Sequence, residues 1–208
     1  MVFSSTVFVF FFLPACLAFY YLVPGLKAKN IILLLFSLVF YAWGEPVYVL
    51  LMIFSIIMNW WIGYNMDRIP EWRRMILILG IVLNLGLLGF FKYYGFALDI
   101  INQIGGTSLE AHRLPLPIGI SFYTFQALSY VIDLYRGKTA VQKNPLVFGL
   151  YISLFPQLIA GPIVRYTDVE QALSDRTIDV RKLGGGYCPF SDRSFKESHF
   201  SQQFRRAI

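Results

Sequence analysis

Apolar runs separated by short polar breaks fill most of the chain, at the spacing expected of membrane-spanning helices. The first run, residues 2–23, contains no charged side chain. Its length is close to the roughly 20 apolar residues that a helix needs to cross about 30 Å of hydrocarbon. The next sequence, PGLKAK, ends the run with a proline, a glycine and two lysines. Residues 2–23 are therefore predicted to form a first membrane span.

Residues 30–64 form a second apolar region, which a Gly-Glu-Pro sequence interrupts. Glycine and proline disfavour helix, and Glu45 would be costly at mid-membrane, so two spans joined by a tight turn are predicted. The part before the turn, residues 31–43, is short for a full crossing, which predicts a tilted, re-entrant or protein-shielded segment. A further span is predicted over residues 75–91, and an external loop is predicted to begin at Lys92.

The next apolar run, residues 116–137, is long enough to cross a bilayer and yet carries a stripe of polar side chains. At about 100° per residue, Gln126, Ser129, Asp133 and Arg136 fall within an arc of roughly 80° on a helix. One interpretation is contact between helices, with Asp133 paired to Arg136. The other is that Gln126, Ser129 and Asp133 line a tunnel for a substrate or an acyl donor.

Residues 146–166 are apolar but contain Pro156 and a Gly-Pro pair at 161–162. These residues interrupt backbone hydrogen bonding, which hydrocarbon permits only where protein or trapped water satisfies the freed groups. A simple crossing would also carry Arg165 and the basic residues after it to the outside. The sequence leaves two alternatives open, a re-entrant segment and a kinked span.

Basic residues occupy alternate loops between the predicted spans, at Lys27, Lys29, Arg68, Arg73, Arg74, Arg136, Lys138 and Lys143. Because cytoplasmic loops are enriched in lysine and arginine, these loops are predicted to be cytoplasmic and the N-terminus external.

The composition agrees with a polytopic all-α membrane protein. Hydrophobic residues make up 57% of the chain and charged residues 14%, against roughly 45–50% apolar residues in soluble domains. The net charge of +6 is spread over short loops, so it indicates membrane orientation and no nucleic-acid partner. Cys16 and Cys188 show no disulfide framework and no metal-site spacing.

Catalytic chemistry is not evident from the residues alone. The sequence contains no nucleophile elbow, phosphate-binding loop, carboxylate pair or His/Cys metal cluster. His112 stands beside Arg113 in a predicted external loop, where an ordinary surface histidine is expected.

Several motifs resemble those of the bacterial membrane-bound O-acyltransferases, especially those that acetylate alginate. The two longest are LPIGISFYTFQALSYVIDLYRG and LFPQLIAGPIVRY, and FYAWGEP and GFFKYYGF occur in the same order as in that family. The resemblance covers residues 1–186, as the N-terminal half of a membrane-embedded acyltransferase domain. It implies a multi-pass protein of the bacterial inner membrane. Such an enzyme would move acetyl from a cytoplasmic thioester such as acetyl-CoA to hydroxyls of an exported polysaccharide, with periplasmic partner proteins and no bound cofactor.

The family's catalytic histidine lies in a WHxS-like motif in the second half of a longer protein. Neither His112 nor His199 matches that motif, so no catalytic residue is assigned and the chain alone is predicted to be inactive. The tail, residues 187–208, departs from the family. Its codons, read one nucleotide downstream, can spell a family-like continuation, which predicts a frameshifted or interrupted gene.

Three alternatives remain. The resemblance also fits the related D-alanyl transferases of teichoic acids. A transporter or flippase component would likewise use polar stripes and broken helices at mid-membrane, but would show two similar interrupted segments, which the sequence lacks. A purely structural membrane subunit is the third alternative.

Overall fold

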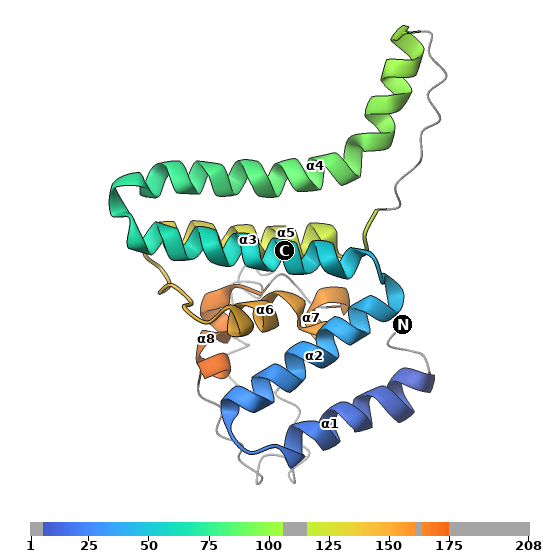
Figure 1. The fold of residues 1–208 in the computed structure, drawn as a ribbon, viewed down its shortest axis with the longest axis vertical. Coiled ribbons are helices and arrows are strands. Elements are labelled where there is room, and N and C mark those ends of the chain that lie inside the picture. Colours follow the sequence, from blue (N-terminus) through green and yellow to red (C-terminus); the bar gives the residue numbers. More distant parts are fainter. Residues whose placement is uncertain (1–5, 106–115, 161–163, 175–208) are drawn as a thin grey trace, which may run out of the picture. The chain divides into compact units, whose positions relative to one another are not determined.

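The computed structural model describes residues 6–105, 116–160 and 164–174, and all regular elements in these ranges are helices (Figure 1). Three are long and apolar enough to cross a membrane, namely α2 (Leu26–Gly44), α3 (Tyr48–Arg68) and the segment Pro70–Phe96. The last combines a single 3-10 turn, η2 (Pro70–Trp72), with most of α4 (Arg73–Gly105). The predicted all-helical class is confirmed, as is the tight turn between the two helices α2 and α3.

The N-terminal helix is shorter than these candidate spans. A π-helical turn, η1 (Phe8–Phe12), leads into α1 (Leu13–Leu22), and together they form one apolar helix. The wider turn comes just before Pro14, whose ring cannot donate a backbone hydrogen bond. The predicted first span is thus helical over its described part.

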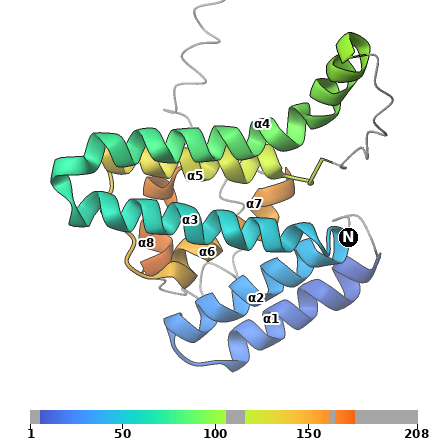
Figure 2. The ribbon, with the colours of Figure 1, turned by 45° about the horizontal axis from the view of Figure 1, so that its top comes forward.

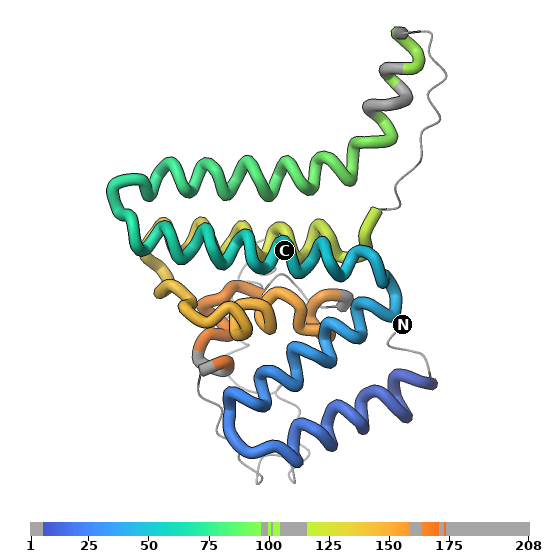
Figure 3. Tube along the Cα trace, viewed as in Figure 1, coloured from blue at the N-terminus to red at the C-terminus, as the bar shows by residue number. Residues whose placement is uncertain are grey.

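Shorter helices complete the described residues: α5 (Ile120–Tyr135), α6 (Pro145–Ser153), α7 (Phe155–Ala160) and α8 (Tyr166–Ser174). Figure 3 traces the path of the chain through them.

Helix α2 begins earlier than its apolar pattern predicts, so the expectation of a short segment over residues 31–43 was wrong. The helix starts at Leu26, directly after Gly25, whose φ of 88° only glycine adopts readily. Lys27 and Lys29 lie in its first turns. Long lysine side chains can carry their charge to water while the helix backbone continues into the apolar region. The helix therefore reaches 19 residues, enough for a crossing.

Helix α4 is also longer than predicted. The expected external loop at Lys92 was wrong, because α4 continues to Gly105. No proline occurs between these residues, so the polar side chains there are compatible with a continuing helix. Figures 1 and 2 show that this C-terminal part of α4 turns away from α3 and α5.

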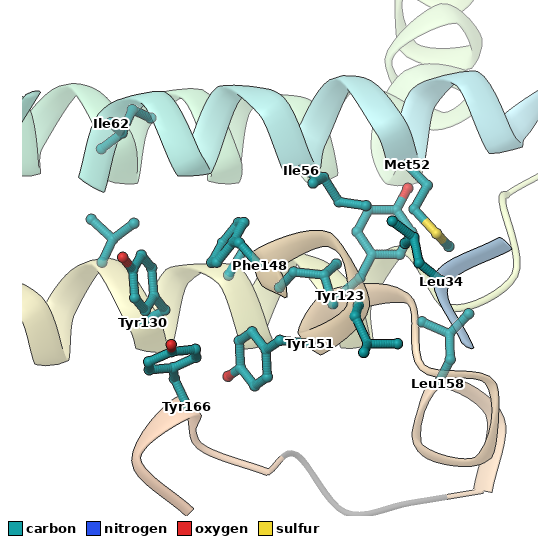
Figure 4. Packing of buried hydrophobic residues seen from close by; sticks show 14 of the residues in the cluster. Leu34, Met52, Ile56, Ile62, Tyr123, Tyr130, Phe148, Tyr151, Leu158 and Tyr166 are labelled. Carbon is teal, nitrogen blue, oxygen red and sulfur yellow. The ribbon is translucent and has the colours of Figure 1, made fainter. Parts of the chain in front are cut away.

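The core lies where α6 packs between α2 on one side and α3 and α5 on the other (Figure 1). Every residue of α6 from Phe148 to Ser153 is buried. Figure 4 shows Phe148 between Tyr130 of α5 and Ile56 of α3. The helices approach closely at Gly63 of α3, where an added Cβ would lie 2.9 Å from the Tyr130 ring. A glycine at this position therefore lets α3 and α5 touch.

Hydrogen bonds identify one end of the bundle. Arg73 donates to the Leu134 carbonyl, which joins the start of α4 to the end of α5. The side chain of Asn30, near the start of α2, donates to the Leu173 carbonyl of α8 at 3.0 Å. We call this the basic end, because basic residues flank these contacts in sequence, at Lys27, Lys29, Arg68, Arg74, Arg136 and Lys138. The predicted grouping of the basic loops on one side is consistent with these contacts.

The chain from α6 to α8 leaves the basic end and returns to it. Gln142, just before α6, donates its side-chain N–H to the Tyr166 hydroxyl at the start of α8 (2.7 Å). Between them, Leu158 of α7 packs beside Gly119, at the opposite end, where α5 begins. A simple crossing would leave Tyr166 at that opposite end. These contacts therefore favour the re-entrant alternative over the kinked span.

All described residues belong to one compact unit, Met1–Asp175. The predicted boundary after residue 186, the tail at 187–208, His112 and His199 lie outside the described residues.

Candidate functional site

The polar stripe of α5 meets the re-entrant segment through Gln126. This side chain is 4% exposed, and its Nε2 donates a hydrogen bond to the Tyr151 carbonyl of α6 at 2.8 Å. Ser129 donates to the Gln126 carbonyl of its own helix, also at 2.8 Å. The structure thus gives Gln126 a contact between helices, as one interpretation of the stripe predicts. The tunnel interpretation stays a prediction.

The two charged members of the stripe lie in different surroundings. Asp133 is 8% exposed, whereas Arg136 is exposed and caps the C-terminal end of α5. In the described part of the chain no ion pair joins them, so the predicted pairing of Asp133 with Arg136 was wrong. The pairing fails because Arg136 follows the last helical turn and its side chain faces solvent.

The break between α6 and α7 is satisfied by protein. Leu154 has an extended ψ of 111°, which interrupts the helix. The Phe155 amide, freed by the break, donates to the Ser37 hydroxyl of α2 at 3.4 Å. The Leu154 carbonyl accepts from the Leu158 amide at 3.0 Å. A broken helix can therefore lie at membrane depth here, because surrounding helices replace the missing backbone partners.

Three tyrosines gather where α5, α6 and α8 meet, as Figure 4 shows. The ring of Tyr166 lies 5.1 Å from that of Tyr130 and 5.2 Å from that of Tyr151, both edge to face. Gln142 links this cluster, since its backbone N–H donates to the Tyr130 hydroxyl (2.9 Å) and its side chain to that of Tyr166. Tyr151 donates to the Val164 carbonyl at 3.0 Å.

This tyrosine cluster fixes the return of the chain to the basic end. Burial raises the pKa of the Tyr166 phenol above its ordinary value, so the hydroxyl stays neutral and able to hydrogen bond. Sequence reasoning missed the cluster, because its members come from segments with no common spacing.

A second polar contact that the sequence did not reveal joins α3 to α4. Asn59 and Asn84 are both fully buried and exchange hydrogen bonds, Asn59 Nδ2 to Asn84 Oδ1 at 3.0 Å and Asn84 Nδ2 to Asn59 Oδ1 at 2.7 Å. Each is an asparagine with apolar residues on both sides in the sequence. That isolation was the available signal, because a buried amide in a span needs a partner.

Some buried polar atoms of α5 have no hydrogen-bond partner among the described residues. The hydroxyls of Tyr123 and Thr124 are examples, and both side chains are 0% exposed. Leaving such a group unpaired costs about 1–3 kcal/mol. The two hydroxyls could therefore bind a polar group of a ligand or of further protein.

The chemistry available to this site is that of amides, hydroxyls and one carboxylate. Among the described residues no group of three His, Cys, Asp or Glu side chains could hold a metal ion. Such groups can position a substrate by hydrogen bonding. Abstracting a proton from a sugar hydroxyl would call for a stronger base, such as histidine.

Three helices long and apolar enough to cross a membrane, with buried amides between them, are the features of a polytopic helical membrane protein. The chain is homologous to O-acetyltransferases of the membrane-bound O-acyltransferase type. It is 42% identical over 197 residues to a "Probable alginate O-acetylase AlgI" of Pseudomonas aeruginosa, covering 91% of this chain and 38% of that protein. A protein of the same name from Pseudomonas syringae pv. tomato is 40% identical over 205 residues, covering 95% and 39%.

A peptidoglycan O-acetyltransferase of Helicobacter pylori is 32% identical over 231 residues, covering 95% of this chain and 44% of that protein. The chain spans about two fifths of the length of these curated relatives. No family model matches the chain, and no solved structure matches it. The resemblance read from the sequence motifs is confirmed.

Proposed function

We propose that this chain is the membrane scaffold of an O-acetyltransferase that modifies hydroxyls of an exported polysaccharide, alginate in the first instance. The observation that carries the proposal is identity of about 40% to alginate O-acetylases over nearly the whole chain. The donor would be an acetyl thioester such as acetyl-CoA on the cytoplasmic side. The acceptor polymer and the proteins that present it would be periplasmic, and the enzyme would lie in the inner membrane.

In this proposal the described residues position the reacting groups. The remainder of the enzyme performs the chemistry. The re-entrant segment places α7 inside the bundle, and Gln126 holds α6 against α5 through the Tyr151 carbonyl. The unpaired hydroxyls of Tyr123 and Thr124 would face partners that the full enzyme supplies. The general base would come from the part of the relatives that this chain does not match.

A chimera tests the proposal. Residues 1–186 would replace the matching segment of the Pseudomonas aeruginosa alginate O-acetylase in cells that lack their own enzyme. We expect acetylated alginate, measured as the acetyl signal in proton spectra of the purified polymer. The 208-residue chain alone should give none. If the chimera reaches the membrane at normal levels and leaves alginate unacetylated but esterifies another polymer, the acceptor assignment is wrong. Incorporation of D-alanine would indicate the related D-alanyl transfer.

The role of Gln126 can be separated from its structural contact in the same chimera. Gln126→Leu removes the hydrogen bond to the Tyr151 carbonyl, which should cost about 1–3 kcal/mol of stability. If the stripe lines a tunnel, acetyl transfer per amount of folded protein should fall as well. Ser153→Ala is the matched control, because Ser153 is fully buried and bonds only the Gly149 carbonyl of its own helix. Equal activity per folded protein in both variants would leave Gln126 a helix contact and refute the tunnel.

A further inference from the structure

A cavity of about 750 Å³ lies at the basic end, outside the α5 stripe. It is formed by the start of α2, the segment before α6, the start of α6 and Leu173 of α8. This volume lies within the range of about 300–1,000 Å³ that small-molecule sites occupy. Lys27 is the single ionisable side chain among the lining residues. The cavity therefore presents a positive charge, and none of the described residues that line it is acidic.

The uncapped N-terminus of α2 contributes backbone donors to this cavity. No side chain caps the helix, and its first backbone bond runs from the Lys29 amide to the Gly25 carbonyl at 3.2 Å. The amides of Leu26, Lys27 and Ala28 thus lack acceptors within the helix, and all three residues line the cavity. Free amides at the positive end of a helix dipole bind anions, phosphates above all.

A second helix, α6, also begins at the cavity, but its N-terminus is closed. Asn144 caps it by accepting a hydrogen bond from the Leu146 amide at 2.9 Å. Its dipole adds positive potential without offering that amide to a ligand. The contrast makes the α2 terminus the place where an anion would bind.

Asn30 supplies independent evidence for a ligand. It lines the cavity and is 4% exposed, and its Nδ2 donates a hydrogen bond to the Leu173 carbonyl. Its Oδ1 is buried with no hydrogen-bond partner among the described residues. A buried carbonyl oxygen of this kind calls for a hydrogen-bond donor. The ligand should therefore carry a donor close to its anion, about one helical turn from the α2 terminus.

Apart from Gln142 and Asn144, the remaining lining residues carry no polar side chain, and Ile31, Val147 and Leu173 are among them. A water-soluble anion would gain nothing from these side chains, whereas a lipid would bury its acyl region there. We propose that the cavity binds an anionic phospholipid whose headgroup carries hydroxyl donors, such as a phosphatidylglycerol. Its phosphate binds the α2 amides and Lys27, and a hydroxyl of the headgroup donates to the Asn30 Oδ1. This site is independent of acyl transfer.

Lipid binding to the purified full chain tests the proposal. Native mass spectrometry in detergent would compare dioleoyl-phosphatidylglycerol with dioleoyl-phosphatidylcholine, which has the same phosphate and tails but no net charge and no headgroup donor. We expect preferential retention of phosphatidylglycerol. Lys27→Gln should weaken it about fivefold, the worth of one cation near anionic lipid. Lys29→Gln is the control, because Lys29 lies over the Tyr20 ring and does not line the cavity.

A cavity-filling variant checks the position of the site without changing charge. Ala28→Phe should reduce phosphatidylglycerol binding and leave helical circular dichroism unchanged. Equal retention of the two lipids, or equal losses with Lys27→Gln and Lys29→Gln, would overturn the proposal. Displacement of the lipid by equimolar acetyl-CoA or inorganic phosphate would show that a soluble phosphate compound is the true occupant, and would overturn it too.

Discussion

The reciprocal pair of Asn59 and Asn84 offers a direct measurement of what holds α3 to α4. Both amides lie near the middle of candidate spans. Each donates to the other and to a backbone carbonyl of its own helix, Asn59 to that of Ser55 and Asn84 to that of Gly80. Replacing one by valine removes both bonds between the helices. It also leaves the partner's Oδ1 buried without a donor.

The cost of a single replacement has two parts. Hydrogen bonds between membrane helices contribute about 0.6 kcal/mol each on average, so two contribute roughly 1 kcal/mol. A buried unsatisfied oxygen adds about 1–3 kcal/mol. Asn59→Val or Asn84→Val alone should therefore destabilise by about 2–4 kcal/mol. The double variant leaves no orphan, so it should cost less than the sum of the single variants, by at least about 1 kcal/mol.

The free energy of unfolding can be measured in mixed micelles by circular dichroism as the mole fraction of dodecyl sulfate increases. The measurement is made on the unsubstituted chain, the two single variants and the double variant. The reasoning predicts a clear coupling between the two positions. If the single costs add to within about 0.5 kcal/mol, the amides act independently and the reasoning fails.

Packing and topology give two further predictions. Gly63→Ala should destabilise the bundle by about 1–3 kcal/mol through its clash with Tyr130, measured by the same unfolding. Gly86→Ala, where an added Cβ meets nothing within 4 Å, carries the same gain in helix propensity and should not destabilise, so equal effects would contradict the packing account. In a background without native cysteines, Trp43→Cys should react with a membrane-impermeant thiol reagent in intact cells, whereas Lys138→Cys should react only after permeabilisation. The reverse pattern would invert the predicted orientation.

The sequence alone determined the helical class and the positions of several breaks. Apolar runs of about 20 residues admit only helices in a bilayer, because every backbone group must be satisfied within the segment. Glycine and proline ended helices where predicted, at the turn before α3 and after α6. These signals are local, because each depends only on the residues of the segment itself.

Helix lengths were less predictable. Lys27 and Lys92 were both assigned to loops, and yet α2 begins before the first and α4 continues past the second. The long side chain of a lysine lets its ammonium group reach water while its backbone is still part of a helix. The charge can therefore lie a full turn or more from the end of the helix. Charge was therefore a poor guide to the helix ends.

The tertiary structure decided which polar groups meet. Asn30 and Leu173 are 143 residues apart, and Ser37 and Phe155 are 118 apart, so no pattern in either segment identifies its partner. These long-range bonds satisfy a broken helix and bring residues 166–174 back to the basic end, which favours the re-entrant alternative that the sequence left open. In hydrocarbon a buried amide or hydroxyl must find a partner, and the sequence shows that need, but only the packed helices determine which group meets it.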